Sequence, residues 1–261
     1  MQLRIALAQM LCEKGALDAN LEATVRIIRE AADRGVDIVG FPEASLTGYV
    51  DPSRYPEALL RLDGDIIIRL LAATRDIETT ALVGIVELRP AELPYVTQLV
   101  IRNGELLGIY RKRTIVDDDL FQYTAGSSAP IFHHKGLPFG IAICSDLGNE
   151  EVFAAAARQG AAIVFELAAP GLYGEQATRN WQSGFQWWEG ECRKYLSTYA
   201  RTYGIWTAVA TQAGRTIDED FPGGAYLFDP TGRRRFAPPD GSPGVVALSL
   251  DLDTGTVTPL A

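Results

Sequence analysis

GVDIVGFPE (residues 35–43) and GAAIVFELA (residues 160–168) share one pattern, a glycine followed by a short apolar run. Each follows a stretch with helical spacing of apolar residues, Asp18–Arg34 in the first case and Glu150–Gln159 in the second. A glycine that ends a helix and leads into a buried strand is typical of an α/β protein. The two stretches therefore predict equivalent strands in two halves of one fold.

The segments on either side repeat in the same order. An apolar strand precedes each helix, and a hairpin follows each half. In the first hairpin Asn103-Gly104 supplies the positive φ angles of a tight type I′ turn. Further strands are expected at 81–88 and 205–211, and further helices at 65–74 and near 189–203; the paired strands are 3–9 and 139–146, and the paired hairpins 97–112 and 225–236. This internal two-fold predicts an α/β fold, a four-layer α-β-β-α sandwich of two mixed sheets. Because no Pro/Gly/Ser linker separates the halves, we expect residues 1–261 to form a single domain.

Composition excludes several classes of protein. The 261 residues are 47% hydrophobic and 22% charged, as in an average globular protein, and the net charge of −9 disfavours binding to nucleic acid or an anionic membrane. No apolar run approaches the ~20 residues of a membrane helix, and the start MQLRIALAQMLCEKG lacks the pattern of a signal peptide. Three widely spaced cysteines do not form a disulfide pattern, so we expect a cytoplasmic protein.

Three reactive residues lie at the ends of predicted strands: Glu43, Lys112 and Cys144. Loops at the carboxyl ends of strands form the usual crevice of an open α/β sheet. Taken singly, each residue also has an ordinary structural interpretation: a core cysteine, a carboxylate at a helix start and a solvated lysine. Their common position makes a shared site the better interpretation.

Other nucleophile and cofactor schemes lack their residues. The two histidines are adjacent, at 133 and 134, in a predicted loop, and the sequence has no G-x-S-x-G, H-E-x-x-H or nucleotide-binding glycine motif. We therefore expect no metal and no cofactor. A cysteine can instead be activated by a carboxylate that accepts its proton and an ammonium that stabilises the oxyanion. Glu43 and Lys112 fit these roles for Cys144, with the backbone N–H of Ser145 as a second oxyanion donor.

Three motifs resemble those of the nitrilase superfamily, the carbon–nitrogen hydrolases. They are FPEASLTGY (41–49), YRKR (110–113) and GIAICSDLGNEEV (140–152), and they occur in the family's order. The resemblance implies the same sandwich fold and hydrolysis of a non-peptide C–N bond through a thioester. It also implies Glu43 as base, Lys112 as oxyanion stabiliser, Cys144 as nucleophile, and a homodimer or higher homo-oligomer formed through the outer helices.

The sequence departs from the family pattern at positions that border the substrate. A second glutamate is common seven residues before a glycine, and counting back from Gly126 gives Asp119, which either orients Lys112 or is a solvated loop residue. Ser145 follows the cysteine where an aromatic residue is frequent. Trp187 lies in a Gly- and Trp-rich segment, 171–191, that lines either the substrate pocket or a dimer contact. Tyr49 and Glu166 are further candidate substrate contacts.

These residues favour an amidase that acts on a small aliphatic or ω-amide and releases ammonia or an amine. A nitrilase or an N-carbamoyl hydrolase would use the same thioester, and the sequence separates them poorly. A glutaminase that supplies ammonia to a synthase and a non-catalytic binding protein on the same scaffold remain alternatives.

Overall fold

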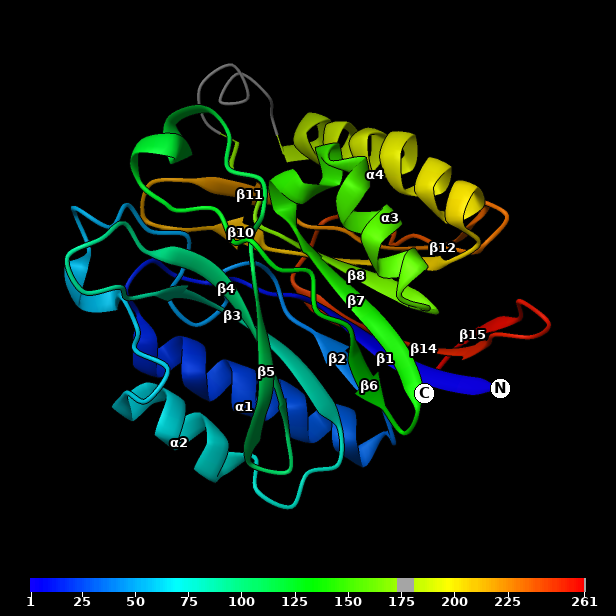
Figure 1. Cartoon of the computed structure of the whole chain (residues 1–261), viewed down its shortest axis with the longest axis horizontal. Helices are drawn as coiled ribbons and strands as arrows, with labels where there is room; N and C mark the ends of the chain where they lie inside the picture. The colour runs from blue at the N-terminus through cyan, green and yellow to red at the C-terminus, as the bar shows by residue number, and fades with distance from the viewer. Residues whose placement is uncertain (173–180, 261) are drawn as a thin grey trace.

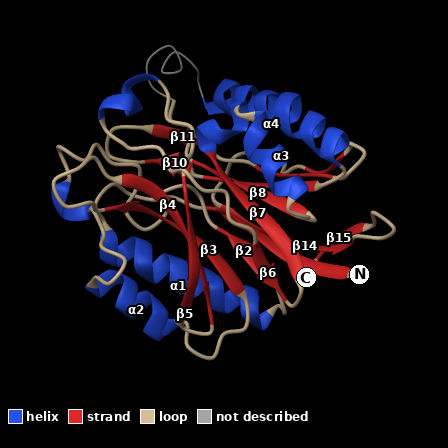
Figure 2. Ribbon diagram, in the orientation of Figure 1, coloured by secondary structure: helices blue, strands red, loops and turns tan. Residues whose placement is uncertain are grey.

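Two β-sheets lie face to face in this protein, and a pair of helices covers the outer side of each (Figures 1 and 2). The computed structural model describes residues 1–172 and 181–260, and of residue 181 the backbone alone. The first sheet carries α1 and α2, and the second carries α3 and α4; their bounds are Leu17–Asp33, Asp65–Ala73, Glu150–Arg158 and Trp181–Tyr203. This arrangement confirms the predicted four-layer sandwich.

The first sheet has seven strands in the order β15-β14-β1-β2-β3-β4-β5. The first three strands of the chain run parallel, and the hairpin β4-β5 continues the sheet antiparallel. The bounds are β1 Gln2–Gln9, β2 Ile38–Gly40, β3 Thr80–Glu87, β4 Tyr95–Arg102, β5 Glu105–Arg111, β14 Gly244–Asp251 and β15 Val257–Pro259.

The second sheet has six strands in the order β13-β12-β9-β8-β7-β6. A small two-stranded sheet, β10-β11, and three 3₁₀ turns, η1 to η3, complete the described elements. The bounds are β6 Phe132–His134, β7 Leu137–Ile143, β8 Ile163–Ala168, β9 Trp206–Thr211, β10 Ala213–Arg215, β11 Asp220–Pro222, β12 Ala225–Phe228, β13 Arg234–Phe236, η1 Pro56–Ala58, η2 Asp117–Phe121 and η3 Cys144–Gly148.

The predicted internal two-fold is present in the topology. In both sheets three parallel strands, β1-β2-β3 or β7-β8-β9, are followed by an antiparallel hairpin, β4-β5 or β12-β13. The connecting helices also correspond, with α1 matching α3 and α2 matching α4. In the first hairpin Asn103 and Gly104 have φ angles of 54° and 73°, as the type I′ turn requires. The predicted single domain and the predicted homo-oligomer stay predictions.

Several elements differ from the sequence prediction; residues 133 and 134, expected in a loop, lie in β6. The strand expected at 36–42 is only β2, because Pro42 has no N–H with which to continue the ladder. Helix α4 begins at residue 181 rather than near 189. Its Gly184 is not a turn residue: a Cβ there would lie 2.5 Å from Leu172, so glycine provides room for packing. Strand β14 is absent from the sequence prediction, since its partner β1 is at the opposite end of the chain.

The two sheets approach each other closely at β2. A Cβ on Gly40 would lie 3.0 Å from Leu167 and 3.6 Å from Phe165 of β8. Both of these side chains therefore point from the second sheet toward the first. None of the helices in the part of the chain that the structure describes is long and apolar enough to cross a membrane.

The segment after β2 lies directly on β3 at Gly84. A Cβ on Gly84 would lie 2.4 Å from the backbone nitrogen of Ala44 and 2.7 Å from the carbonyl oxygen of Pro42. Ser45 and Thr47 accept hydrogen bonds from the N–H groups of Gly84 and Val86, at 3.0 and 3.1 Å. The turn that carries Glu43 is therefore fixed against the centre of the first sheet.

We predict that Gly84→Ala destabilises the fold by about 1–3 kcal/mol, because the new methyl group meets backbone atoms that cannot move independently. Urea unfolding gives this change in the free energy of unfolding. Gly190→Ala is the matched control: its Cβ would meet no atom within 4 Å. Alanine inside a helix is favoured over glycine by about 0.8–1 kcal/mol. Equal stability of the two variants would contradict the close approach at Gly84.

Candidate active site

The three reactive residues that the sequence singled out follow the ends of three strands. Glu43 lies beyond β2, Lys112 follows β5 directly, and Cys144 follows β7 directly. Strand β3 is parallel to β2, β4 is antiparallel to β3, and β5 is antiparallel to β4. Strand β5 therefore runs in the same direction as β2. The carboxyl ends of these strands therefore share one edge of the first sheet, and the end of β7 meets it from the second sheet.

Glu43 and Lys112 form a buried ion pair. The Lys112 Nζ donates to Glu43 Oε1 at 2.8 Å, and the two side chains are 2% and 0% exposed. The other carboxylate oxygen, Oε2, accepts the backbone N–H of Ala169 at 3.2 Å. Ala169 follows β8, so the second sheet helps to hold a carboxylate that comes from the first.

The surroundings of this pair set its protonation. Burial raises the pKa of Glu43 above its ordinary value, and the charge and hydrogen bond of Lys112 oppose that rise only in part. For Lys112, burial alone would lower the pKa, but the charges of Glu43, Cys144 and Asp119 outweigh it and raise the pKa. The ammonium therefore stays charged, and the carboxylate is a stronger base than an exposed glutamate.

Cys144 sits at a strained turn. Its φ angle of 46° lies in the left-handed region, which side chains other than glycine rarely adopt. Burial raises the pKa of its thiol, as does the charge of Glu43, while Lys112 acts in the opposite direction. The thiol also interacts with the Glu43 carboxylate. The resting group is thus a neutral thiol beside a carboxylate able to accept its proton.

Asp146 connects the turn at Cys144 to the strand that leads to Lys112. One carboxylate oxygen accepts the Tyr110 hydroxyl at 2.7 Å and the Ile143 N–H at 3.0 Å. The other accepts the N–H groups of Arg113 and Thr114, at 3.2 and 2.8 Å. The sequence analysis gave Asp146 no role beyond its place in the motif. Its position two residues after the cysteine, in a buried turn, is the signal that could have identified it.

Asp119 and Tyr49 complete the polar side of the site. Asp119 Oδ2 lies 3.7 Å from Lys112 Nζ and accepts a hydrogen bond from the Tyr49 hydroxyl. The ring of Tyr49 has the Lys112 ammonium 5.7 Å from its centroid. Asp119 therefore lies near Lys112, as predicted. Its carboxylate is farther from the Lys112 ammonium than that of Glu43 is.

A pocket of about 290 Å³ opens onto Cys144. It contains the predicted residues Lys112, Asp119, Tyr49, Ser145 and Trp187; its other lining residues are Val116, Cys144, Leu147, Gly148, Ala169, Pro170, Gly171, Trp188, Glu191 and Tyr195. The Ser145 hydroxyl donates to the Thr114 carbonyl at 2.5 Å, so its side chain holds the loop after Lys112. The predicted pocket segment 171–191 also includes Trp181, whose side chain lies outside the described residues, as do positions 173–180.

Glu166, like Glu43, does not line this pocket, whereas the other predicted site residues do. It stands inside β8 and pairs with Ala142, and its neighbours Phe165 and Leu167 point toward the first sheet. Alternation along a strand therefore directs Glu166 to the side of α3 and α4. It is 0% exposed, and neither carboxylate oxygen has a hydrogen-bond partner among the described residues. Aligning the two repeats at Ile38 and Ile163 also places Glu166 two positions away from the counterpart of Glu43.

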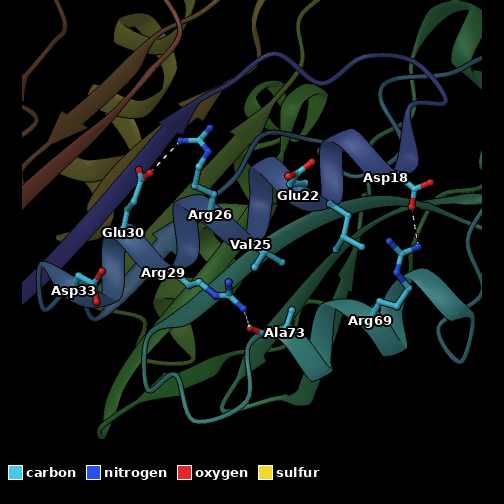
Figure 3. A pocket seen from close by; sticks show the side chains of 10 residues that line it. Asp18, Glu22, Val25, Arg26, Arg29, Glu30, Asp33, Arg69 and Ala73 are labelled. Carbon is cyan, nitrogen blue, oxygen red and sulfur yellow. Dashed lines mark hydrogen bonds and ion pairs between the residues drawn. The ribbon is translucent and has the colours of Figure 1, made fainter.

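A second hollow, of about 630 Å³, lies on the outer face of α1 and α2 (Figure 3). Its arginines already have partners in the protein: Arg69 bonds to Asp18 at 2.8 Å and Arg26 to Glu30 at 3.1 Å. Arg29 donates to the Ala73 carbonyl at 3.1 Å. This second hollow shares no lining residue with the pocket at Cys144, and none of its described lining residues is a candidate nucleophile. The smaller pocket is therefore the candidate site.

A family model described as carbon–nitrogen hydrolase matches residues 4–259. The chain belongs to this family. The resemblance to the nitrilase superfamily is thereby confirmed, and the family is one of carbon–nitrogen hydrolase enzymes.

Two curated relatives differ in what they are named for. The glutamine-dependent NAD(+) synthetase of Thermotoga maritima is 28% identical over 244 residues, which cover 88% of this chain and 39% of the relative. The (R)-stereoselective amidase of Pseudomonas sp. is 26% identical over 162 residues, which cover 62% of this chain and 58% of that protein. This carbon–nitrogen hydrolase chain therefore spans about two-fifths of the length of the synthetase.

Solved structures agree with the fold. The glutamine-dependent NAD+ synthetase of Acinetobacter baumannii superposes with a TM-score of 0.83 at 20% identity, over 100% of this chain and 48% of that one. A mutant of the amidase from Nesterenkonia sp. AN1 superposes with a TM-score of 0.81 at 22% identity, over 96% and 91% of the two chains. At these identities the likeness concerns the fold.

We predict that Glu166→Gln makes the protein more stable at alkaline pH. Burial raises the pKa of the Glu166 carboxyl well above its ordinary value, and the charges of Asp146 and Glu43 act in the same direction. A carboxyl whose pKa is raised by folding stabilises the fold fully below its unfolded-state pKa, and this contribution is lost as the pH rises through the folded-state pKa. Glutamine stays neutral, so its variant escapes that loss.

Thermal unfolding between pH 5 and 9 measures the effect, with Glu151→Gln as control, since Glu151 is exposed and paired with Arg158. The melting temperature of Glu166→Gln should match that of the unsubstituted protein at the acidic end and exceed it at the alkaline end. Parallel curves over the whole range would show that folding does not raise the pKa of Glu166.

Proposed function

We propose that this chain hydrolyses a small amide through a thioester on Cys144. The observation that carries the proposal is the buried Glu43–Lys112 pair beside the Cys144 thiol, with Lys112 and Cys144 lining a pocket of about 290 Å³. A base, a cation and a nucleophile at one point are what acyl transfer requires.

In the first half-reaction the Cys144 sulfur attacks the amide carbon and its proton passes to Glu43. The carbonyl oxygen becomes an oxyanion, which the Lys112 ammonium stabilises together with the N–H of Ser145. The C–N bond then breaks, Glu43 returns the proton to the departing nitrogen, and ammonia or an amine leaves. Cys144 now carries the acyl group as a thioester.

In the second half-reaction Glu43 accepts a proton from water, and the resulting hydroxide attacks the thioester carbon. Lys112 stabilises the second oxyanion. The C–S bond breaks, the proton returns to the sulfur and the carboxylic acid is released. Asp119 and Tyr49 hold Lys112 in position, and Asp146 holds the turn that carries Cys144.

A glutaminase that supplies ammonia to a synthetase is the second candidate function. It is favoured by the curated relatives named glutamine-dependent NAD(+) synthetases, of which the Thermotoga maritima protein is 28% identical over 88% of this chain. Glutamine is itself a small primary amide, so the same thioester chemistry serves both functions. They differ in whether the released ammonia goes to solvent or to an acceptor protein.

The test is intact-protein mass after brief incubation with a panel of small amides, nitriles, N-carbamoyl compounds and glutamine, together with an assay for released ammonia. We expect an acyl mass gain and ammonia release with amides, and neither in Cys144→Ala. Ammonia release by Cys144→Ala above the blank would contradict the nucleophile. Turnover of nitriles or N-carbamoyl compounds without amides would replace the amidase with one of those activities, and turnover of glutamine alone would favour the glutaminase.

A further inference from the structure

Helix α4 forms the pocket wall that contains Glu191. Trp187, Glu191 and Tyr195 recur at intervals of four residues, so they lie on one face of the helix, and all three line the pocket. Trp188 also lines it, with its ring centroid 5.9 Å from that of Trp187. This wall, which we call the α4 wall, contains one carboxylate among three aromatic rings. None of its members takes part in the proposed thioester chemistry.

The charges around the pocket are unbalanced. Among the described residues that line it, three have ionisable acidic or basic side chains at neutral pH: Lys112, Asp119 and Glu191. Lys112 already pairs with Glu43 at 2.8 Å and has Asp119 at 3.7 Å. Its charge is therefore neutralised before any substrate arrives. The Glu191 carboxylate is 35% exposed, and its ion-pair partner among the described residues is Lys194, whose ammonium lies 4.0 Å away on a side chain that is 61% exposed.

Aromatic faces and a carboxylate together bind organic ammonium groups. The ring faces attract a cation through their quadrupole, and the carboxylate supplies the opposite charge. The protein's own Lys194 illustrates this at the outer edge of the wall. Its ammonium lies 4.4 Å from the centroid of the Tyr195 ring and 4.0 Å from Glu191. A carboxylate-terminated substrate would instead meet Glu191 and Asp119, which repel it.

We infer that the α4 wall recognises a positively charged group on the acyl part of the substrate, with Glu191 as the opposite charge and the rings of Trp187 and Tyr195 beside it. This inference rests on the proposed function and names its substrate class: short amides that carry an ammonium group at the end remote from the amide. Glu191 is then a specificity-determining residue. Of the aliphatic and ω-amides expected from the sequence, those with a terminal carboxylate are disfavoured.

Three amides of matched shape test the inference: 4-aminobutanamide, pentanamide and glutaramic acid. They share the (CH₂)₃CONH₂ portion and end in an ammonium, a methyl and a carboxylate group. We expect kcat/KM at pH 7 to fall in that order, with the ammonium amide at least tenfold above pentanamide. In Glu191→Gln the ratio between these two amides should fall about tenfold, and the loss should shrink at high salt, as for a charge interaction.

Glu189→Gln is the matched control. It lies on the same helix and loses the same charge, but its side chain pairs with Arg234 and does not line the pocket. Its ratio of kcat/KM values should equal that of the unsubstituted protein. An equal fall in both variants would assign the effect to net charge alone and overturn the role of Glu191. Turnover of pentanamide without any preference for the ammonium amide would overturn the inference and leave the proposed function intact.

A labelling experiment separates the two when no amide is turned over. Cys144 is treated with 2-aminoethyl, propyl and 2-sulfonatoethyl methanethiosulfonates, and the rate of mixed-disulfide formation is followed by intact mass, with Cys144→Ala as background. The free cysteines 12 and 192 are buried. Faster labelling by the cationic reagent, lost in Glu191→Gln and kept in Glu189→Gln, supports the α4 wall even if the proposed function fails. Equal rates for the cationic and propyl reagents overturn it.

Discussion

The candidate site depends on one interaction, the ion pair between the almost fully buried side chains of Lys112 and Glu43. Removing both charges from water costs several kcal/mol for each, and their attraction offsets this only with good geometry and further hydrogen bonds. Here the additional partners are the Ala169 N–H on Glu43 and Asp119 near Lys112. The buried ion pair is therefore stable only where the strand ends of both sheets meet, because its additional partners come together there. The surrounding fold brings those strand ends together.

The two halves of the internal two-fold contribute different residues to the candidate site. The first half contributes Glu43, after β2, and Lys112, after β5; the second half contributes Cys144, after β7. In the second half Glu166 is displaced by two positions from the counterpart of Glu43, so the repeat of the strand pattern does not repeat the chemistry. Asp146 joins the halves, because it accepts hydrogen bonds from Tyr110 on one side and Ile143 on the other.

Local sequence predicted those parts of the fold and site that depend on neighbours along the chain. The Asn103-Gly104 turn, the end of β5 before Lys112, and Glu43 after Pro42 follow from turn chemistry and strand ends. Strand β14 was missed because its partner β1 is more than two hundred residues away. The position of Glu166 outside the pocket lining was not predictable, because a carboxylate near a strand end can face either side of its sheet. Asp146 was left without a role because its four donors come together only after folding.

The central claim is that Glu43 accepts the proton of Cys144, and the most direct measurement is the rate of Cys144 alkylation by iodoacetamide against pH, in the unsubstituted enzyme and in Glu43→Gln. Burial raises the pKa of Glu43, so below that pKa the group is protonated and cannot act as a base. We predict a rate that rises with pH through a value above 4.5, and in Glu43→Gln a slow rate that rises only when the thiol itself ionises. Superimposable profiles for the two proteins would contradict the claim.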